Sequence, residues 1–351
     1  MKLCKVSELV GGEILARPVM TPNFQVLLSE ETKLQADYIR KLQELEIQEV
    51  YIHDETTIHL EEVVILKSEI EESFKNKVKD ILEKHTYSNS QELAQLSSTA
   101  DNIITNILEE KEVVERIFDI KERSSDIYEH SISICTLATL TALKLGLSQG
   151  EVHDIGVSCL LHDLGLRYLT IEYNNQDINK LSDLEIAEYR KHPVYANSAL
   201  KDENWISKES KEMILYHHER LDGSGFPLHA REIPLNARIV AVCDAFDEMI
   251  CGIGCERVKV YEAIEFLKTF TNSQFDKQVV DIFLEFTAVY PAGSYVLTNE
   301  GETGVVLRQN KEFPNRPVIK VIKDKRGKEL REEKILDLIK VNHIFIDKVL
   351  E

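Results

Sequence analysis

Apolar side chains between residues 123 and 288 recur at helical spacing, without the alternation expected of a strand. The pattern predicts helices over 132–145, 152–161, 213–218, 237–250, 258–269 and 278–287. Gly146 can end the first of them. Ser148 to Glu151 and Ser182 to Glu185 have the spacing of capping boxes, which start helices. We therefore predict an all-helical domain over 123–288.

The first 60 residues mix the helical and the extended pattern. Helical spacing is found at Leu34, Tyr38, Ile39, Leu42 and Leu45. Short runs typical of strands flank this helix at 24–28 and 49–52, and Asn23, Gly11 and Gly12 indicate turns. Residues 1–60 are thus predicted to form a small α/β unit.

Residues 61–122 are highly charged and mostly helical in pattern, with an interruption at 85–91. Helices this polar usually cover a neighbouring element or mediate pairing, so a helical linker and a dimerisation segment both stay open, and with the latter a homodimer.

Residues 289–351 change to a strand pattern. Extended runs begin at Tyr295, Gly304 and Val318, with turn signals at 299–301 and 324–327. The predicted fold class is therefore mainly α: an all-helical domain between a small N-terminal α/β unit and a small β-rich C-terminal appendage.

Composition narrows the functional classes. The 351-residue chain is 43% hydrophobic and carries a net charge of -19, which argues against a non-specific DNA binder. No stretch approaches the roughly 18 apolar residues of a membrane span, and the N-terminus has no signal-peptide pattern. We expect a cytoplasmic protein.

Six cysteines show no regular disulfide framework: Cys4, Cys135, Cys159, Cys243, Cys251 and Cys255. Free thiols in a reducing compartment are expected. Cys251 and Cys255 are four residues apart, so a metal pair and two ordinary buried thiols are both open.

The helical domain also contains seven of the eleven histidines, several next to aspartates. Neighbouring residues on a helix point about 100° apart, so His162 with Asp163, and His217 with His218, can share a site only if that site is extended. A pair of metal ions about 3.5–4 Å apart is such a site, and it is a standard arrangement for phosphate ester hydrolysis. We predict a metal centre here.

Four segments in order resemble one known family: YEHS at 128–131, HDLG at 162–165, KHP at 191–193 and HHERLDGSGFP at 217–227. The segment IPLNARIVAVCDAFD at 233–247 extends the match to about 165 residues. This part of the chain resembles the HD-GYP domain, a branch of the HD superfamily of metal-dependent phosphohydrolases, in a divergent form.

The resemblance implies two divalent ions, iron or manganese, held by His130, His162, Asp163, His192, His217, His218 and Asp244. Asp163 would bridge both ions. Some family members hold a third ion through a carboxylate one turn before the first histidine, where this chain has Asp126. An N-cap role is the other interpretation of Asp126, and we favour it.

The implied activity is hydrolysis of cyclic di-GMP to pGpG or GMP, with attack by a hydroxide that bridges the metals. His162 and Asp163 would be the catalytic pair. Gly223, Gly225, Phe226 and Arg220 would contact the substrate, with Arg167 and Arg257 as further candidates. The two glycines could instead serve only the turn itself.

Three positions depart from the family pattern, and the loss of a lysine and an arginine among them removes cationic phosphate contacts. Phe226 replaces the family tyrosine, Leu166 replaces its lysine, and the arginine expected after Asp247 is absent, with Arg257 as the nearest replacement. A metal-binding module without catalysis, acting as a sensor or interaction domain, is therefore the alternative function, and hydrolysis of a related cyclic dinucleotide is another. A diguanylate cyclase or another signalling protein is the kind of protein partner that the resemblance suggests.

Overall fold

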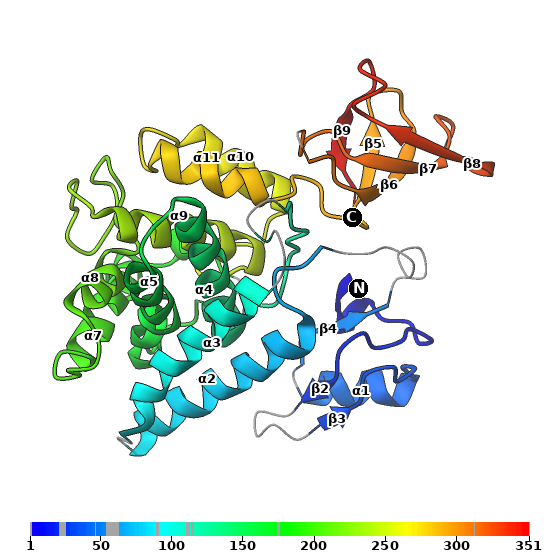
Figure 1. Cartoon of the computed structure of the whole chain (residues 1–351). Coiled ribbons are helices and arrows are strands. Elements are labelled where there is room, and N and C mark those ends of the chain that lie inside the picture. Colours follow the sequence, from blue (N-terminus) through cyan, green and yellow to red (C-terminus); the bar gives the residue numbers. More distant parts are fainter. Residues whose placement is uncertain are drawn as a thin grey trace. The chain divides into compact units, whose positions relative to one another are not determined.

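The computed structural model describes residues 2–20, 26–45, 47–53, 63–88, 91–109, 113, 116–173, 176–311 and 313–350. It divides into two compact units (Figure 1). One consists of 63–291 with 309–315, and the other of 1–62, 292–308 and 316–351. Among the described residues, no helix is long and apolar enough to cross a membrane.

The N-terminal segment has the predicted α/β character. Strand β1 (Lys2–Lys5) pairs antiparallel with β4 (Glu49–Ile52), and β2 (Val19–Met20) pairs with β3 (Val26–Leu28). The 3-10 turn η1 (Val6–Glu8) and helix α1 (Ala36–Glu44) complete it. Leu34, Ile39 and Leu42 are buried in its small core, as their spacing predicts. Asn23 and the start of the predicted strand at 24–28 lie outside the described residues.

The C-terminal segment is a five-stranded antiparallel sheet in the order β8-β7-β6-β5-β9. Its strands are β5 (Tyr295–Thr298), β6 (Thr303–Arg308), β7 (Val318–Lys323), β8 (Glu329–Asp337) and β9 (Ile346–Val349). Val296, Val306 and Ile319 are fully buried. The predicted β-rich appendage is confirmed.

The other unit is helical. Its longer helices are α2 (Ser68–Ser88), α3 (Gln95–Glu109), α4 (Ile127–Lys144), α5 (Gln149–Leu161), α9 (Leu235–Cys251), α10 (Val260–Thr269) and α11 (Lys277–Phe286). The shorter elements are η2 (Gln91–Ala94), η4 (His162–Tyr168), η5 (Ile178–Lys180), α6 (Asp183–Tyr189), α7 (His192–Ala199) and α8 (Lys208–Tyr216). The all-helical prediction for this part of the chain is confirmed.

Local signals explain where several helices start. Ser148 and Ser182 form the predicted capping boxes with Glu151 and Glu185, at the starts of α5 and α6. Asp126 caps α4: its Oδ1 atom accepts hydrogen bonds from the amides of Tyr128 (2.9 Å) and Glu129 (3.1 Å). These bonds satisfy amides that a helix start leaves without partners.

Helices α2 and α3 lie against α4, and α3 also lies against α5 (Figure 1). Their apolar residues Val78, Ile81, Leu96 and Ile103 are buried in the same core as the helices that follow. The segment 61–122 therefore covers the helical unit over its described residues. Its boundary at 122 and its role in a homodimer stay predictions.

Helix α7 packs directly on η4, and Gly165 makes this approach possible. A Cβ atom at Gly165 would lie 1.9 Å from the carbonyl oxygen of His192 and 2.9 Å from the amide nitrogen of Ala196. Both elements carry residues of the predicted metal centre, Asp163 and His192. Glycine at 165 therefore allows η4 and α7 to pack closely enough for Asp163 and His192 to meet.

We expect Gly165→Ala to lower the free energy of unfolding by about 1–3 kcal/mol, because backbone atoms would have to move apart. Gly150→Ala in α5 is the matched control: a Cβ atom there meets nothing within 4 Å. Alanine at 150 should be neutral or stabilising, by up to about 1 kcal/mol. Urea unfolding of both variants tests this, and equal stability of the two would contradict it.

Candidate metal centre

The seven predicted ligands come from five separate elements. His130 lies in the first turns of α4, His162 and Asp163 begin η4, and His192 begins α7. His217 and His218 directly follow α8, and Asp244 lies in the middle of α9. All seven side chains are buried, with at most 7% of their surface exposed. The structure brings together every residue of this set.

The first group of ligand atoms surrounds Asp244. The Oδ1 atom of Asp244 lies 3.3 Å from Nε2 of His130 and 3.5 Å from Nε2 of His162. The same two nitrogens lie 3.6 Å and 3.3 Å from Oδ2 of Asp163. His130, His162 and Asp244 each offer a ligand atom within 4.8 Å of the others, and Oδ2 of Asp163 lies beside the two imidazoles of this group.

The second group lies on the other side of Asp163. Its Oδ1 atom is 3.5 Å from Nε2 of His192 and 3.9 Å from Nε2 of His217. His218 belongs to the same group, with ligand atoms within 4.8 Å of one another. One oxygen of Asp163 therefore faces each group, which is the geometry required of a carboxylate shared by two ions.

Three imidazoles are oriented by their own chain. The Nδ1 atoms of His162, His192 and His217 each lie 2.7 Å from the carbonyl oxygen three residues earlier, on Cys159, Tyr189 and Ile214. Each Nδ1–H donates to that carbonyl, so each Nε2 faces the centre and is the atom that a cation could bind.

His130 is oriented by a residue that the sequence analysis missed. Asp247, which is fully buried one turn after Asp244, accepts a hydrogen bond from Nδ1 of His130 at 2.8 Å. Ser133 donates to its other oxygen at 2.6 Å. A carboxylate behind a histidine fixes the ring and increases the basicity of its free nitrogen. The spacing D-x-x-D at 244–247 was the signal available in the sequence.

Burial and charge determine the ionisation of the centre. Burial raises the pKa of a carboxyl, but the charge of His162 outweighs it at Asp163, as that of His218 does at Asp244, and both pKa values are lowered. Burial lowers the pKa of His162, yet Asp163 and Asp244 outweigh this and raise it to about 10. Burial, helped by the charge of His162, lowers the pKa of His217 to about 3. Without a cation, the centre thus combines ionised carboxylates with a protonated His162 and a neutral His217.

The donor atoms fit cations better than they fit one another. Nε2 of His130 and of His162 and both oxygens of Asp244 are buried without a hydrogen-bond partner. Nε2 of His192 lies 3.2 Å from Nε2 of His217, although both rings use Nδ1–H for a carbonyl. Two facing lone pairs and buried polar atoms without partners cost free energy that a shared metal ion would remove. The residues therefore fit divalent ions.

Two candidate residues have other roles in the structure. Asp126 uses its carboxylate to cap α4 and belongs to none of the groups that could hold an ion. The guanidinium of Arg167 donates to the hydroxyl of Tyr128 and lies 5.9 Å from the centre of its ring. The hydrogen bonds between the carboxylate of Asp126 and the first amides of α4 therefore agree with the N-cap interpretation that we favour.

The loop after His218 is shaped by its glycines. A Cβ atom at Gly225 would lie 2.4 Å from the carbonyl oxygen of His218 and 2.5 Å from the amide nitrogen of Arg220. Gly223 has a positive φ of 79°. Both glycines thus serve the path of the loop itself. Contact with a substrate stays a prediction.

Glu219 holds the far end of this loop. It is 1% exposed, and its two carboxylate oxygens accept hydrogen bonds from the amides of Leu228 (2.6 Å) and Ala230 (2.8 Å). The loop carries Phe226, whose ring lies 4.5 Å from that of His218, with an interplanar angle of 30°. An aromatic side chain is therefore fixed against the ligand group.

The remaining cationic candidates face the protein. The guanidinium of Arg220 donates to the carbonyls of His217 (3.2 Å) and Glu219 (3.0 Å) and stacks on Phe275 at 4.9 Å. Nε of Arg257 donates to the carbonyl of Cys251 at 3.5 Å.

The sulfur of Cys251 lies 3.9 Å from Nδ1 of His130, and both Cys251 and Cys255 are free thiols.

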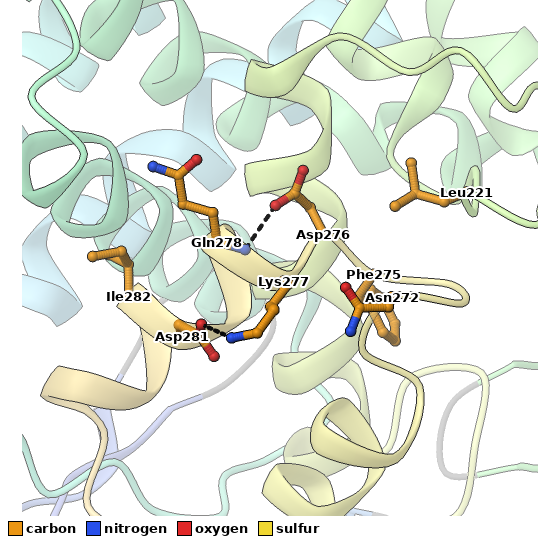
Figure 2. A pocket seen from close by; sticks show the side chains of 8 residues that line it. All are labelled: Leu221, Asn272, Phe275, Asp276, Lys277, Gln278, Asp281 and Ile282. Carbon is orange, nitrogen blue, oxygen red and sulfur yellow. Dashed lines mark hydrogen bonds and ion pairs between the residues drawn. The ribbon is translucent and has the colours of Figure 1, made fainter.

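A separate pocket lies at the start of α11. Its volume is about 610 Å³, and Figure 2 shows the residues that line it: Leu221, Asn272, Phe275, Asp276, Lys277, Gln278, Asp281 and Ile282. Asp276 caps α11 through the amide of Gln278 at 2.8 Å. None of these eight residues belongs to the candidate metal centre.

The fold and the centre agree with the family comparison. Residues 112–279 match the HD domain, and residues 295–351 match a KOW domain associated with HD domains. The helical part of this chain belongs to the HD domain family, and its motifs place it in the HD-GYP branch.

Particular relatives support this assignment. The cyclic di-GMP phosphodiesterase PA4108 of Pseudomonas aeruginosa is 31% identical over 249 residues, which are 70% of this chain and 59% of that protein. The 3'3'-cGAMP-specific phosphodiesterase 2 of Vibrio cholerae is 26% identical over 204 residues, 57% of this chain and 37% of its own length. The chain thus spans less than two thirds of the length of these relatives.

A solved structure supports the fold alone. Bd1817, an HDG"Y"P protein from Bdellovibrio bacteriovorus, superposes with a TM-score of 0.55 at 19% identity. The match covers 80% of this chain and 97% of that one.

We expect Asp247→Asn to weaken metal binding by about 10–100-fold, because His130 loses the charged partner that fixes its ring. Asp281→Asn on α11 is the control, since Asp281 pairs only with the exposed Lys277 among the described residues. Titration of the metal-free proteins with Mn²⁺ in a calorimeter measures both. Unchanged affinity in the Asp247 variant would show that its contact with His130 has no role in metal binding.

Proposed function

We propose that this chain is a metal-dependent phosphodiesterase that hydrolyses a cyclic dinucleotide, with cyclic di-GMP as the first candidate and 3'3'-cGAMP as the second. The observation that carries this proposal is the position of Asp163, with one carboxylate oxygen facing each of two histidine groups. The names of the relatives motivate the choice of substrates.

The predicted ligands divide between two metal ions. His130, His162 and Asp244 would hold one ion, His192, His217 and His218 the other, and Asp163 both. Mixed imidazole and carboxylate donors suit iron and manganese. When bound, two such ions stabilise the charge that develops on a phosphoryl group and make water a better nucleophile. The products would be linear pGpG and, after a second cut, GMP.

Phe226 would stack on a purine base of the substrate. Its ring lies beside that of His218, and the guanidinium of Arg190 lies 5.7 Å from its centre. A flat aromatic surface next to the metal centre can stack on a purine while the phosphate meets the ions. The hydroxyl that the family tyrosine carries is not required for stacking.

One observation favours a second function, a module that binds metal and nucleotide without turnover. Leu166, at the place of the family lysine, is 2% exposed, and Arg167 is bonded to Tyr128. Arg220 and Arg257 donate to backbone carbonyls. Each lost charge-assisted contact costs about 1.5–3 kcal/mol, so two together could reduce affinity or rate a hundredfold or more.

The test is the release of product by protein purified without oxygen and loaded with Mn²⁺ or Fe²⁺. We expect wild type to convert cyclic di-GMP or 3'3'-cGAMP to linear product, followed by chromatography. Asp163→Ala should reduce the rate by about a hundredfold or more, because both ions lose a shared ligand.

Asp281→Asn, in the middle of α11 and exposed, should keep the full rate. Circular dichroism of the Asp163 variant establishes that it remains folded. Metal-loaded wild type that binds either nucleotide without product would assign the second function. Metal-loaded wild type that neither binds nor cleaves either nucleotide would overturn both.

A further inference from the structure

Glu248 places a third acidic side chain at the centre. It follows Asp244 by one turn of α9, and its side chain is 16% exposed. Its Oε1 atom lies 3.8 Å from Nε2 of His218 and accepts a hydrogen bond from the hydroxyl of Tyr189 at 3.4 Å. No lysine or arginine forms an ion pair with it within the described ranges. A nearly buried carboxylate without a cationic partner is costly.

Asp244 has a second oxygen that the metal pair does not require. Its Oδ1 atom faces His130 and His162, whereas Oδ2 lies 3.4 Å from Nδ1 of His218 on the opposite side. Asp244 is 1% exposed, and Oδ2 accepts no hydrogen bond. This unpartnered oxygen therefore points toward the region that His218 and Glu248 border.

His218, Asp244 and Glu248 each offer a ligand atom within 4.8 Å of the others. We propose that Glu248 and Oδ2 of Asp244 hold a further divalent cation beside the predicted pair, next to His218, which stays a ligand of the pair. The inference depends on the metal centre of the proposed function and is independent of its substrate.

The composition of this position has two consequences. Two carboxylates favour a hard cation such as Mn²⁺. A cation here would also add positive charge near the pair, in a domain where Leu166 stands in place of a lysine and Arg167 is bonded to Tyr128. The carboxylate of Glu248 would then support phosphate binding, whereas without a cation it would oppose it.

Asp126 is the competing source of an additional ligand, and the structure separates the two. Its carboxylate is bonded to the amides of Tyr128 and Glu129, whereas Glu248 borders two of the predicted ligands. The two residues therefore predict opposite results for the same measurement.

The experiment is a metal count on full-length protein, reconstituted with Mn²⁺ without oxygen, freed of loose metal and measured by mass spectrometry. We expect about three ions per wild-type chain and about two for Glu248→Gln, which keeps the side-chain volume and loses the charge. Calorimetric titration should show one binding step weakened at least tenfold.

Glu256→Gln is the matched control, because Glu256 is exposed and pairs with Lys180 at 2.6 Å. It should retain the wild-type count, as should Asp126→Asn. A third peak of anomalous scattering between His218, Asp244 and Glu248 in Mn²⁺-loaded wild-type crystals would support the proposal without any variant.

A wild-type count of two, or a Glu248→Gln variant with the wild-type count and affinities, overturns the inference. Loss of an ion in Asp126→Asn instead would assign the position to Asp126 and overturn it as well. The count does not depend on cleavage, so a protein that holds its ions but releases no product would refute the proposed activity and leave this inference standing.

Discussion

The position of one carboxylate, that of Asp163, controls the arrangement of the centre. Its two oxygens face different histidine groups at 3.3–3.9 Å, so the groups are linked through a single side chain. This requires that His162 and Asp163, although adjacent, both point inward. The α-helix α5 ends at Leu161, and the tighter turn η4 begins at His162, which redirects the chain at the place where the two side chains must diverge.

The apolar core of the helical unit holds this polar centre together. Helices α4, α5 and α9 contact one another and are buried over most of their length, and they carry or adjoin His130, His162 and Asp244. Buried donors and acceptors without partners oppose folding, so the packing of the surrounding helices must offset their cost. The loop from 219 to 230 is fastened by Glu219, which keeps Phe226 against His218.

The helices and the histidine and aspartate residues that meet in the buried centre could be predicted from the sequence, whereas the residues that orient them could not. Apolar periodicity predicted five of the longer helices of the helical unit (α4, α5, α9, α10 and α11) and the two capping boxes, because these are local properties. Helix α7 was not predicted because its eight residues, starting His-Pro, have too little periodicity to stand out. The support of His130 by Asp247 and the contact of Glu248 with His218 join residues 117 and 30 positions apart, and only the folded chain reveals such pairs.

Three of the histidines are oriented by carbonyls only three residues before them, on Cys159, Tyr189 and Ile214. In each of these tetrapeptides the backbone carbonyl fixes both the orientation of the imidazole and the nitrogen that carries the proton. Neither depends on the surrounding side chains. The orientation of these three rings is therefore set by local backbone geometry, and a substitution elsewhere in the core should leave it unchanged as long as these three turns keep their conformation.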